Sequence, residues 1–425
     1  MSLSRVVVTA VGVISPLALD STQHFQQLLA GESAVSPLEG SEYRNYPPVL
    51  QACVKDFDRR QFVPDRMLRK LLSPSPAFAL ASSTEALRNA DLDPAEFTDC
   101  GLYVGSVCLD ANPEALIPAL RASINEHDEL SLDRFVIYGM GLVDPLFLVK
   151  SLPNAGLCAI AIQHQILGPN ANITNGGASG IQALMAAFEA IRHQEAEIAV
   201  AGAYDSLLQM DCVVEHLLAG RLVQTTQSPE RSCRPFDRNR SGYALGEGAA
   251  FLILESLGHA RRRGAKVHGE ILSFGDTTQS SLLLQRGSDD GETLSLAALE
   301  ALESAGISAR EVDAVFGDGT AFADDDEREC RAYERVFGDS GPAFTAATGA
   351  IGYTGAASGA FSLVHACLAL SGGVLPPLIN CDDPVPDCPL PIVRQKRAAD
   401  LGRVLVWNSD RGIKNTAVLV SACLD

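Results

Sequence analysis

The sequence lacks several features that define other classes of protein. Its 425 residues include one tryptophan, and no stretch reaches about 18 consecutive apolar residues, so we expect no membrane-spanning helix. Basic residues are scarce, because 33 Lys and Arg stand against 52 Asp and Glu, for a formal net charge of −19. A nucleic-acid backbone or an anionic membrane attracts a basic surface. We therefore expect neither nucleic acid nor a membrane as a partner.

A disulfide framework and a secretory leader are also missing. Eleven cysteines form an odd number with irregular spacing, which is typical of reduced thiols. The apolar start, Val6 to Leu19, contains Gly12 and Pro16 and has no basic cluster before it. These features indicate a first strand and a turn rather than a signal peptide. We expect a cytoplasmic protein.

What is present indicates a layered α/β protein. Apolar residues make up 47% of the chain, and β-rich apolar runs alternate with helical patterns throughout. The clearest helical patterns are Ser179–His193, with apolar residues at i, i+3, i+4 and i+7, and Gly359–Leu370. Predicted strands are Arg5–Gly12, Cys100–Gly105, Ile198–Gly202, Ala249–Glu255, Ala314–Gly317, Val404–Trp407 and Ala417–Ser421.

The length predicts two units, because 425 residues exceed the usual size of a single core. The periodic pattern breaks at residues 257–266, where a basic, glycine-containing stretch holds Arg261, Arg262 and Arg263. We take this stretch as the junction between an N-terminal half, residues 1–256, and a C-terminal half, residues 267–425. We expect its arginines to form a solvated helix end.

One long run carries a resemblance to a known family. Residues Arg234 to Ala250 read R-P-F-D-R-N-R-S-G-Y-A-L-G-E-G-A-A and closely resemble the R-P-F-D…G-x-x-x-G-E-G-A signature of β-ketoacyl-acyl-carrier-protein synthases. Val6–Leu17 and Leu254–Ala260 look like the first strand and the junction of the same family. The resemblance implies a thiolase-like fold, in which two similar β/α halves form α-β-α-β-α layers and the protein works as a dimer.

The same resemblance implies a condensation of acyl thioesters with malonyl thioesters on an acyl carrier protein. Such chemistry needs a thiolate nucleophile and, usually, two histidine donors. The family reads T-A-C-A/S-S-G at the start of a long helix, where this sequence reads Thr174 to Gly180 and Gly177 replaces the cysteine. Glycine has no side chain to acylate. Nearby Ser179 is interpreted as a helix N-cap, with a substitute nucleophile as the alternative.

Both histidines are missing as well. The family's H-G-T-G-T-x-x-x-D-x-x-E corresponds to Phe316–Glu327, with Phe316 at the histidine, and a phenyl ring cannot donate a hydrogen bond. The acidic residues 324–327 are expected to form a solvated loop or a local ion pair rather than a metal site. The second histidine, in K-S-M-T-G-H-T-L-G-A-A-S-G, becomes Tyr353 or, with a different gap, Gly352, and we prefer Tyr353.

The gate loop near the C-terminus has also changed. The family's N-S-F-G-F-G-G-T-N appears as Asn408–Thr416, with Asn408 and Ser409 kept and the aromatic gate lost. A ketosynthase scaffold without its cysteine and histidines resembles the chain-length factor of type II polyketide synthases. This resemblance implies a non-catalytic subunit that pairs with a catalytic ketosynthase and shapes the polyketide tunnel.

Partners and substrate follow from that resemblance. We expect no resident cofactor and no metal, because the substrate arrives on the phosphopantetheine of an acyl carrier protein. The net charge of −19 predicts that the acidic carrier docks mainly on the partner ketosynthase. Candidates for lining the tunnel are Tyr138, Met140 and Phe147, for which plain core positions are the alternative. The remaining alternatives for the whole chain are a stand-alone acyl-binding homodimer and an acyltransferase that uses an unorthodox nucleophile such as Ser179.

Overall fold

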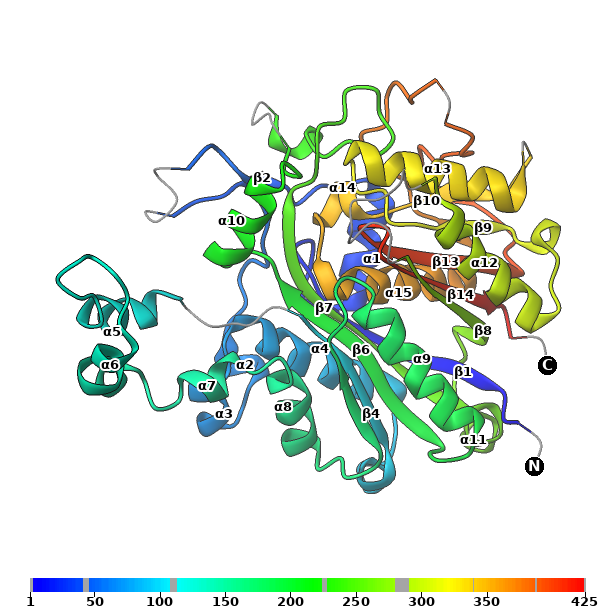
Figure 1. Cartoon of the computed structure of the whole chain (residues 1–425). Coiled ribbons are helices and arrows are strands. Elements are labelled where there is room, and N and C mark those ends of the chain that lie inside the picture. The colour runs from blue at the N-terminus through cyan, green and yellow to red at the C-terminus, as the bar shows by residue number, and fades with distance from the viewer. Residues whose placement is uncertain are drawn as a thin grey trace.

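The computed structural model describes residues 3–40, 46–107, 113–223, 228–279, 290–338, 340–386 and 388–423. Its centre is one continuous twelve-stranded mixed sheet, in which ten strands form two five-stranded parts and two short strands, β2 (Ser36–Pro37) and β3 (Leu50–Ala52), join through the N-terminal part (Figure 1). The N-terminal part contains β1 (Val6–Ile14), β4 (Gly101–Gly105), β5 (Asn170–Ile173), β6 (Ile198–Ser206) and β7 (Leu245–Ser256). The C-terminal part contains β8 (Gly269–Thr278), β9 (Ala314–Phe316), β10 (Ala343–Thr345), β13 (Arg403–Asp410) and β14 (Lys414–Ser421).

The two parts repeat one topology. Reading from the outer edge inward, the strand order is β5-β4-β6-β7-β1 in the first part and β10-β9-β13-β14-β8 in the second. In each part the fifth strand along the chain, β7 or β14, runs antiparallel to its two neighbours. The parts join where Val6, Val7 and Val8 of β1 pair with Ile271, Glu270 and Gly269 of β8. The predicted pair of similar β/α halves is confirmed.

Helices complete the five layers. Helices α9 (Ser179–Arg192) and α15 (Ser358–Gly372) lie between the two sheet parts and share a single apolar core with both of them. Helices α4 (Pro74–Ala90) and α8 (Ala155–His164) cover the outer face of the first part. Helices α12 (Glu292–Ala305) and α13 (Ala323–Phe337) cover the outer face of the second part. The predicted α-β-α-β-α layering is therefore observed.

Shorter elements connect these layers. The remaining helices are α1 (Ser21–Ala30), α2 (Arg59–Phe62), α3 (Arg66–Leu71), α5 (Ile117–Ala122), α6 (Leu132–Arg134), α7 (Phe147–Ser151), α10 (Met210–Leu218), α11 (Leu257–Arg263) and α14 (Thr348–Ile351). The remaining strands are β11 (Val374–Leu375) and β12 (Arg397–Ala398). Helices α5, α6 and α7 project from one side of the body (Figure 1).

Helix α11 occupies the stretch that we expected to separate the halves. It begins after Ser256, whose hydroxyl accepts from the backbone N–H of His259, and ends at Gly264 in the left-handed region. The expectation of a purely solvated end is wrong for Arg263, whose guanidinium Nε donates to the buried Glu255 carboxylate at 2.8 Å. The exact domain boundaries at 256 and 267 stay a prediction.

Among the described residues, one helical stretch, Gly355–Gly372, is long and apolar enough to cross a membrane by composition. Most of it is buried inside the protein, because 72% of the window is covered by other residues. It contains α15, which lies in the middle layer between the two sheet parts. The apolar character of this stretch is therefore explained by packing inside the protein.

Candidate functional site

The site is built around the turn that leads from β5 into α9. Gly176 has a φ of +59°, in the left-handed region where glycine is favoured. Ser179, which is fully buried, donates its hydroxyl to the Gly176 carbonyl at 2.7 Å and accepts from the Asn175 N–H at 2.8 Å. The prediction that Ser179 is the N-cap is wrong, because Ala178 is the capping residue and Ser179 is the first helical residue. Its hydroxyl instead closes the turn that presents Gly177.

Two side chains occupy the space that a residue at position 177 would enter. A Cβ built on Gly177 would lie 2.8 Å from the Tyr353 hydroxyl and 3.5 Å from the Asp410 side chain. A Cβ on Gly176 would lie 1.8 Å from Oδ2 of Asp410. Any side chain here would displace these groups. The structure thus places a phenol and a carboxylate where the family pattern has a cysteine.

Tyr353, rather than Gly352, faces Gly177. Its ring is buried and lies 4.8 Å from the ring of Tyr243, and burial raises the pKa of its hydroxyl well above the ordinary value. A Cβ on Gly352 would instead point toward the carbonyl of Ala244. The placement agrees with our preference for Tyr353. A neutral phenol can donate one hydrogen bond, but it is not a nucleophile at neutral pH.

Phe316 does not belong to the site. It lies on β9, pairs in register with Thr345 and Val406, and is buried in the apolar core between the sheet parts. The residue that reaches the strand beside Asp410 is Asp318, whose carboxylate accepts from the Ser409 N–H. The expected position of the first histidine is therefore corrected from Phe316 to Asp318.

The buried acids of α13 show why the assignment shifts by two residues. Asp326 accepts from the backbone N–H groups of Phe236 at 2.7 Å and Ala321 at 3.1 Å. Glu329 accepts from the N–H groups of Asp318 and Gly319, both at 2.9 Å, and from Trp407 Nε1 at 2.6 Å. Since these two acids reproduce the D-x-x-E spacing and hold the loop, Asp318-Gly319-Thr320 falls on H-G-T.

The signature run at 234–250 packs beside the same loop, since the Cβ position of Gly319 lies 3.1 Å from the Phe236 ring and 3.2 Å from Pro235. Arg234 pairs with the fully buried Asp237 at 3.0 Å, and Asp237 accepts from the backbone N–H groups of Asp382 and Asp383 at 3.0 and 2.9 Å. Phe236 packs edge-on against Phe344, with ring centroids 5.3 Å apart. This part of the run therefore supports the loops around the site.

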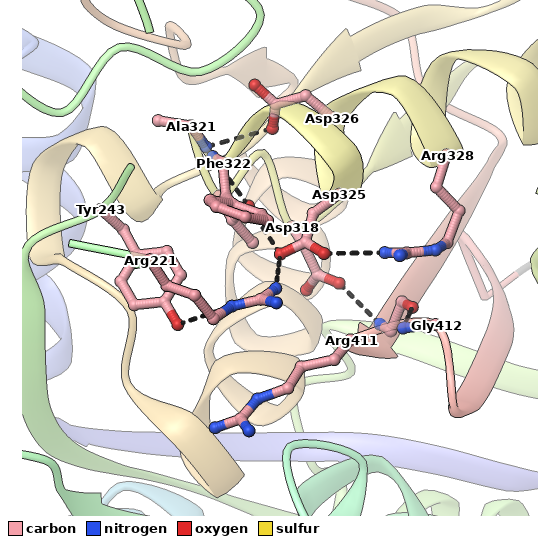
Figure 2. A network of polar contacts seen from close by, with 12 residues as sticks. Arg221, Tyr243, Asp318, Ala321, Phe322, Asp325, Asp326, Arg328, Arg411 and Gly412 are labelled. Carbon is pink, nitrogen blue, oxygen red and sulfur yellow. Dashed lines mark hydrogen bonds and ion pairs between the residues drawn. The ribbon is translucent and has the colours of Figure 1, made fainter. Parts of the chain in front are cut away.

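A network of buried charges borders the site (Figure 2). Arg221 forms an ion pair with Asp325, and Arg328 pairs with the same carboxylate at 2.9 Å. Arg221 also donates to the Tyr243 hydroxyl at 3.2 Å, and its guanidinium lies 4.3 Å from the centre of the Phe322 ring. Burial and the nearby Arg221 lower the pKa of Arg328 to about 10. The expectation of a solvated acidic loop is wrong here, while the local ion pair is observed.

Asp318 is held firmly in this environment. It accepts from Asn408 Nδ2 at 2.7 Å and from the Ser409 N–H at 2.6 Å. Burial, and next the charge of Glu329, raise the pKa of Asp318 well above the ordinary value. Among the described residues, no group of three or more His, Cys, Asp or Glu side chains is arranged to hold a metal ion. The arrangement offers hydrogen bonds and charge, without a thiol or an imidazole at Gly177.

Two family models cover most of the chain. The model for the beta-ketoacyl synthase N-terminal domain matches residues 3–260, and the model for the C-terminal domain matches residues 268–382. The chain belongs to the β-ketoacyl synthase family. Its fold is the thiolase-like fold of that family.

Curated relatives align with this β-ketoacyl synthase chain over nearly its whole length. It is 28% identical to 3-oxoacyl-[acyl-carrier-protein] synthase 2 of Coxiella burnetii, with 100% of both chains covered. It is 29% identical to the oxytetracycline polyketide putative beta-ketoacyl synthase 1 of Streptomyces rimosus, covering 98% of this chain and 97% of the relative. It is also 28% identical to 3-oxoacyl-[acyl-carrier-protein] synthase 2 of Rhizobium meliloti, with 89% of both chains covered.

Solved structures show the same fold. The ishigamide ketosynthase/chain length factor superposes with a TM-score of 0.87 at 23% identity, with 100% of both chains covered. A type II PKS acyl-carrier protein in complex with its ketosynthase bound to the hexaketide gives a TM-score of 0.83 at 22% identity, again over 100% of both chains. At these identities the likeness establishes the architecture of this β-ketoacyl synthase.

The predicted tunnel residues lie on the surface of this β-ketoacyl synthase chain. Tyr138 and Met140 are 55% and 58% exposed, so the alternative that they are plain core is wrong for both. Phe147, at the start of α7, is half-buried. They belong to a segment, residues 117–152, that we call the apolar segment. It exposes thirteen large apolar side chains: Ile117, Leu120, Ile124, Leu130, Leu132, Val136, Ile137, Tyr138, Met140, Leu142, Leu146, Val149 and Leu152.

Proposed function

We propose that this chain is a chain-length-factor-like subunit that pairs with a catalytic ketosynthase during decarboxylative condensation of malonyl units on an acyl carrier protein. The observation that carries the proposal is a complete ketosynthase fold in which the nucleophile position is Gly177, filled by Tyr353 and Asp410. Condensation needs a thiolate to hold the acyl chain and donors to stabilise the enolate. Asp318 and Tyr353 supply neither an imidazole nor a thiol.

The apolar segment supports a partner. Thirteen large apolar side chains exposed within residues 117–152 are far more than scattered surface residues, and such patches mark interaction sites. Strand β5, which follows this segment, is the edge of the described sheet and pairs only with β4. An exposed strand edge is a template for pairing with another chain. A second ketosynthase-fold chain could cover both features together.

A partner would also change the surroundings of Tyr138, Met140 and Phe147. These side chains stand on the surface of the single chain, where they cannot enclose an acyl chain. Covered by a catalytic ketosynthase, the apolar segment would form one wall of a closed cavity that starts at the partner's cysteine. This arrangement would let residues of this chain limit product length without touching the reacting atoms.

The alternative of an unorthodox nucleophile receives little support. The Ser179 hydroxyl is fully buried and is engaged both as donor and as acceptor within its own turn. A serine nucleophile needs an adjacent base and access to the substrate. A stand-alone acyl-binding homodimer would use the same apolar segment, so it remains the second candidate and is separated by the experiment below.

The test is native mass spectrometry of this chain co-expressed with a type II catalytic ketosynthase of its own source, after incubation with an acyl-carrier thioester. We expect a one-to-one heterodimer with the acyl mass on the ketosynthase alone. The matched control is a ketosynthase whose nucleophilic cysteine is replaced by alanine, which should form the heterodimer and carry no acyl mass. Acyl mass on this chain, or a homodimer that ignores the ketosynthase, would contradict the proposal.

A further inference from the structure

Asp410 stands at a position that the family pattern gives to an aromatic gate. In N-S-F the third residue is phenylalanine, and in Asn408-Ser409-Asp410 it is an aspartate. We infer that Asp410 is a built-in carboxylate ligand of the Gly177 turn and that it closes this site against acyl groups. The inference deepens the proposed function and rests on it only for the absent nucleophile, since it does not depend on the partner.

The first observation is the contact itself. The Asp410 carboxylate lies against the turn, with Oδ1 3.5 Å from the Cβ position of Gly177 and Oδ2 1.8 Å from that of Gly176. Burial raises the pKa of Asp410, while the charge of Arg411 and the backbone N–H of Gly177 oppose that rise. Gly177 lies two residues before α9, a helix of 14 residues. Backbone N–H groups at the start of a helix bind anions well. The carboxylate therefore occupies an anion position that an acyl oxygen would otherwise take.

A second and independent group points into the same space. The Tyr353 side chain is only 7% exposed and packs against the ring of Tyr243. Its hydroxyl lies 2.8 Å from the Cβ position of Gly177. A neutral phenol at this place can donate one hydrogen bond to a group that enters the site. The turn, the phenol and the carboxylate thus converge on one small volume.

Asp410 is positioned by rigid structure. It is the last residue of β13 and pairs in register with Lys414 at the start of β14. Its carbonyl accepts from the Ile413 N–H at 2.9 Å, which closes the tight connection between the two strands. The preceding Ser409 N–H is tied to Asp318 at 2.6 Å. The backbone on both sides of Asp410 is therefore held, which fixes the place from which its side chain reaches the Gly177 turn.

Gly176, Gly177 and Asp410 depend on one another, because the carboxylate occupies the space that a side chain at either glycine would need. Oδ2 of Asp410 lies where a Cβ on Gly176 would stand, at 1.8 Å, and Gly176 also needs a positive φ of +59°. A cysteine introduced at position 177 would share its space with Tyr353 and Asp410. Removing the Asp410 side chain should open a site for a small monocarboxylate, of which acetate is the probe.

The first experiment measures thermal unfolding of the full chain and its Asp410→Gly variant in acetate or chloride of equal ionic strength. We expect about 0.1 M acetate to raise the melting temperature of Asp410→Gly by about 3 °C more than chloride does. The wild type and Asp410→Asn, which keeps an acceptor oxygen in place, should show no such difference. An equal acetate effect on all three proteins, or no effect on Asp410→Gly, would overturn the inference.

The second experiment places a thiol in the site. In a Cys158→Ser background, which removes an exposed cysteine, Gly177→Cys is compared with Gly177→Cys combined with Asp410→Gly. Iodoacetamide alkylates the thiolate, forming a C–S bond as iodide leaves, and peptide mass spectrometry follows residue 177. We expect about tenfold faster alkylation in the combined variant. Equal rates would overturn the inference.

Both experiments leave the partner question separate. Asp410→Gly should still form the heterodimer with the ketosynthase in native mass spectrometry, because Asp410 lies outside the apolar segment. If alkylation and acetate binding fail while the heterodimer forms, the built-in ligand is wrong and the proposed function stands. If the heterodimer fails while acetate binds Asp410→Gly, the reverse holds.

Discussion

The Gly177 site and the apolar segment are opposites in the same chain. At the Gly177 site, which comprises Gly177, Asp318, Tyr353 and Asp410, the space is filled by the protein's own polar side chains. In the apolar segment, thirteen large apolar side chains are 40% or more exposed among the described residues. The first region is filled by side chains of the same chain. The second is the region for which we propose a partner.

The largest expected effect comes from placing charges in the apolar segment. Replacing Leu132 and Ile137, which are 76% and 67% exposed, with aspartate places two charges inside the expected interface. We predict a loss of heterodimer affinity of at least about 100-fold, because buried unpaired charges are strongly unfavourable, measured by analytical ultracentrifugation. Leu296→Asp, at a 48% exposed position on the outer helix α12, is the matched control and should leave affinity unchanged. Equal losses in both would remove the special role of the segment.

The second prediction concerns Glu329, the buried acid that holds the loop beside the Gly177 site. Glu329→Ala leaves Trp407 Nε1 and the N–H groups of Asp318 and Gly319 without their acceptor. We expect the free energy of unfolding to fall by about 3 kcal/mol, measured by urea denaturation. The control is Glu327→Ala on the same helix, whose side chain is 51% exposed, and it should change stability by less than about 0.5 kcal/mol. A small effect of Glu329→Ala would mean that Glu329 does not stabilise the loop at Asp318 and Gly319.

A third prediction concerns the pH dependence of stability at a buried pair of histidines away from the Gly177 site. Fully buried His24 and His365 meet at 2.7 Å between their Nε2 atoms, and burial lowers the pKa of His24 to about 3. The unfolded chain binds the proton near pH 6.5, so this pair's stability is present above that pH and is lost as pH falls toward 3. Between pH 7 and pH 4.5 we expect a loss of about 3 kcal/mol from His24 alone.

The control for this pH effect removes both imidazoles. In the double variant His24→Leu with His365→Leu, Ser15 keeps its bonds to the backbone of Leu17 and Ala18. Urea unfolding at the two pH values should show a loss smaller by at least about 3 kcal/mol than in the wild type, because the burial of His365 also lowers its pKa. An unchanged pH dependence would show that other groups dominate acid unfolding.

The fourth prediction tests whether the apolar segment shapes a product. We expect Met140→Trp to shorten the main product of the heterodimer by at least one two-carbon unit, while turnover falls by less than about threefold. The reason is that Met140 would face the acyl chain without touching the reacting atoms. Liquid chromatography with mass spectrometry of the products makes the measurement. Leu142→Trp is the control for general disturbance, and loss of all products in both would contradict the assignment of Met140.

The smallest expected effect concerns the carrier protein. Although the whole chain is acidic, residues 59–70 contain five Arg or Lys and one Asp, and Arg60, Arg66 and Lys70 are exposed. If the carrier docks mainly on the partner, Arg66→Glu with Lys70→Glu should weaken carrier binding to the heterodimer by only about threefold. Surface plasmon resonance at low salt measures this change. A loss greater than about 30-fold would instead place the main carrier site on this chain.

Much of the fold could be predicted because local patterns carry it. The helix expected at Ser179–His193 is observed at Ser179–Arg192, and all seven predicted strands are present within a few residues. Strands β5, β8 and β10 were not predicted. In β8, Glu270 interrupts the apolar pattern, and it is buried beside Arg5, 265 residues away, which pairs with it at 2.5 Å.

The site was harder to predict because two registers fit the same letters. Gly317 and Gly319 both match a glycine of the motif, and D-x-x-E occurs at Asp324–Glu327 as well as at Asp326–Glu329. Only burial separates them, since Asp326 and Glu329 are buried while Glu327 is half exposed. The second spacing was a signal in the sequence that could have suggested Asp318. For Tyr353 the gap was open, and packing against Gly177 decided it.

The sequence by itself determined the layered fold, the family and the absence of a thiol at position 177. These depend on periodicity, glycine spacing and residue identity, which are local. Only the tertiary structure decided that Tyr353 and Asp410 face Gly177 and that Asp318 binds Ser409 beside Asp410, because these residues come from segments 35 to 233 residues apart. Only it decided that residues 117–152 face outward, since an apolar run reads the same whether its own core or another chain covers it.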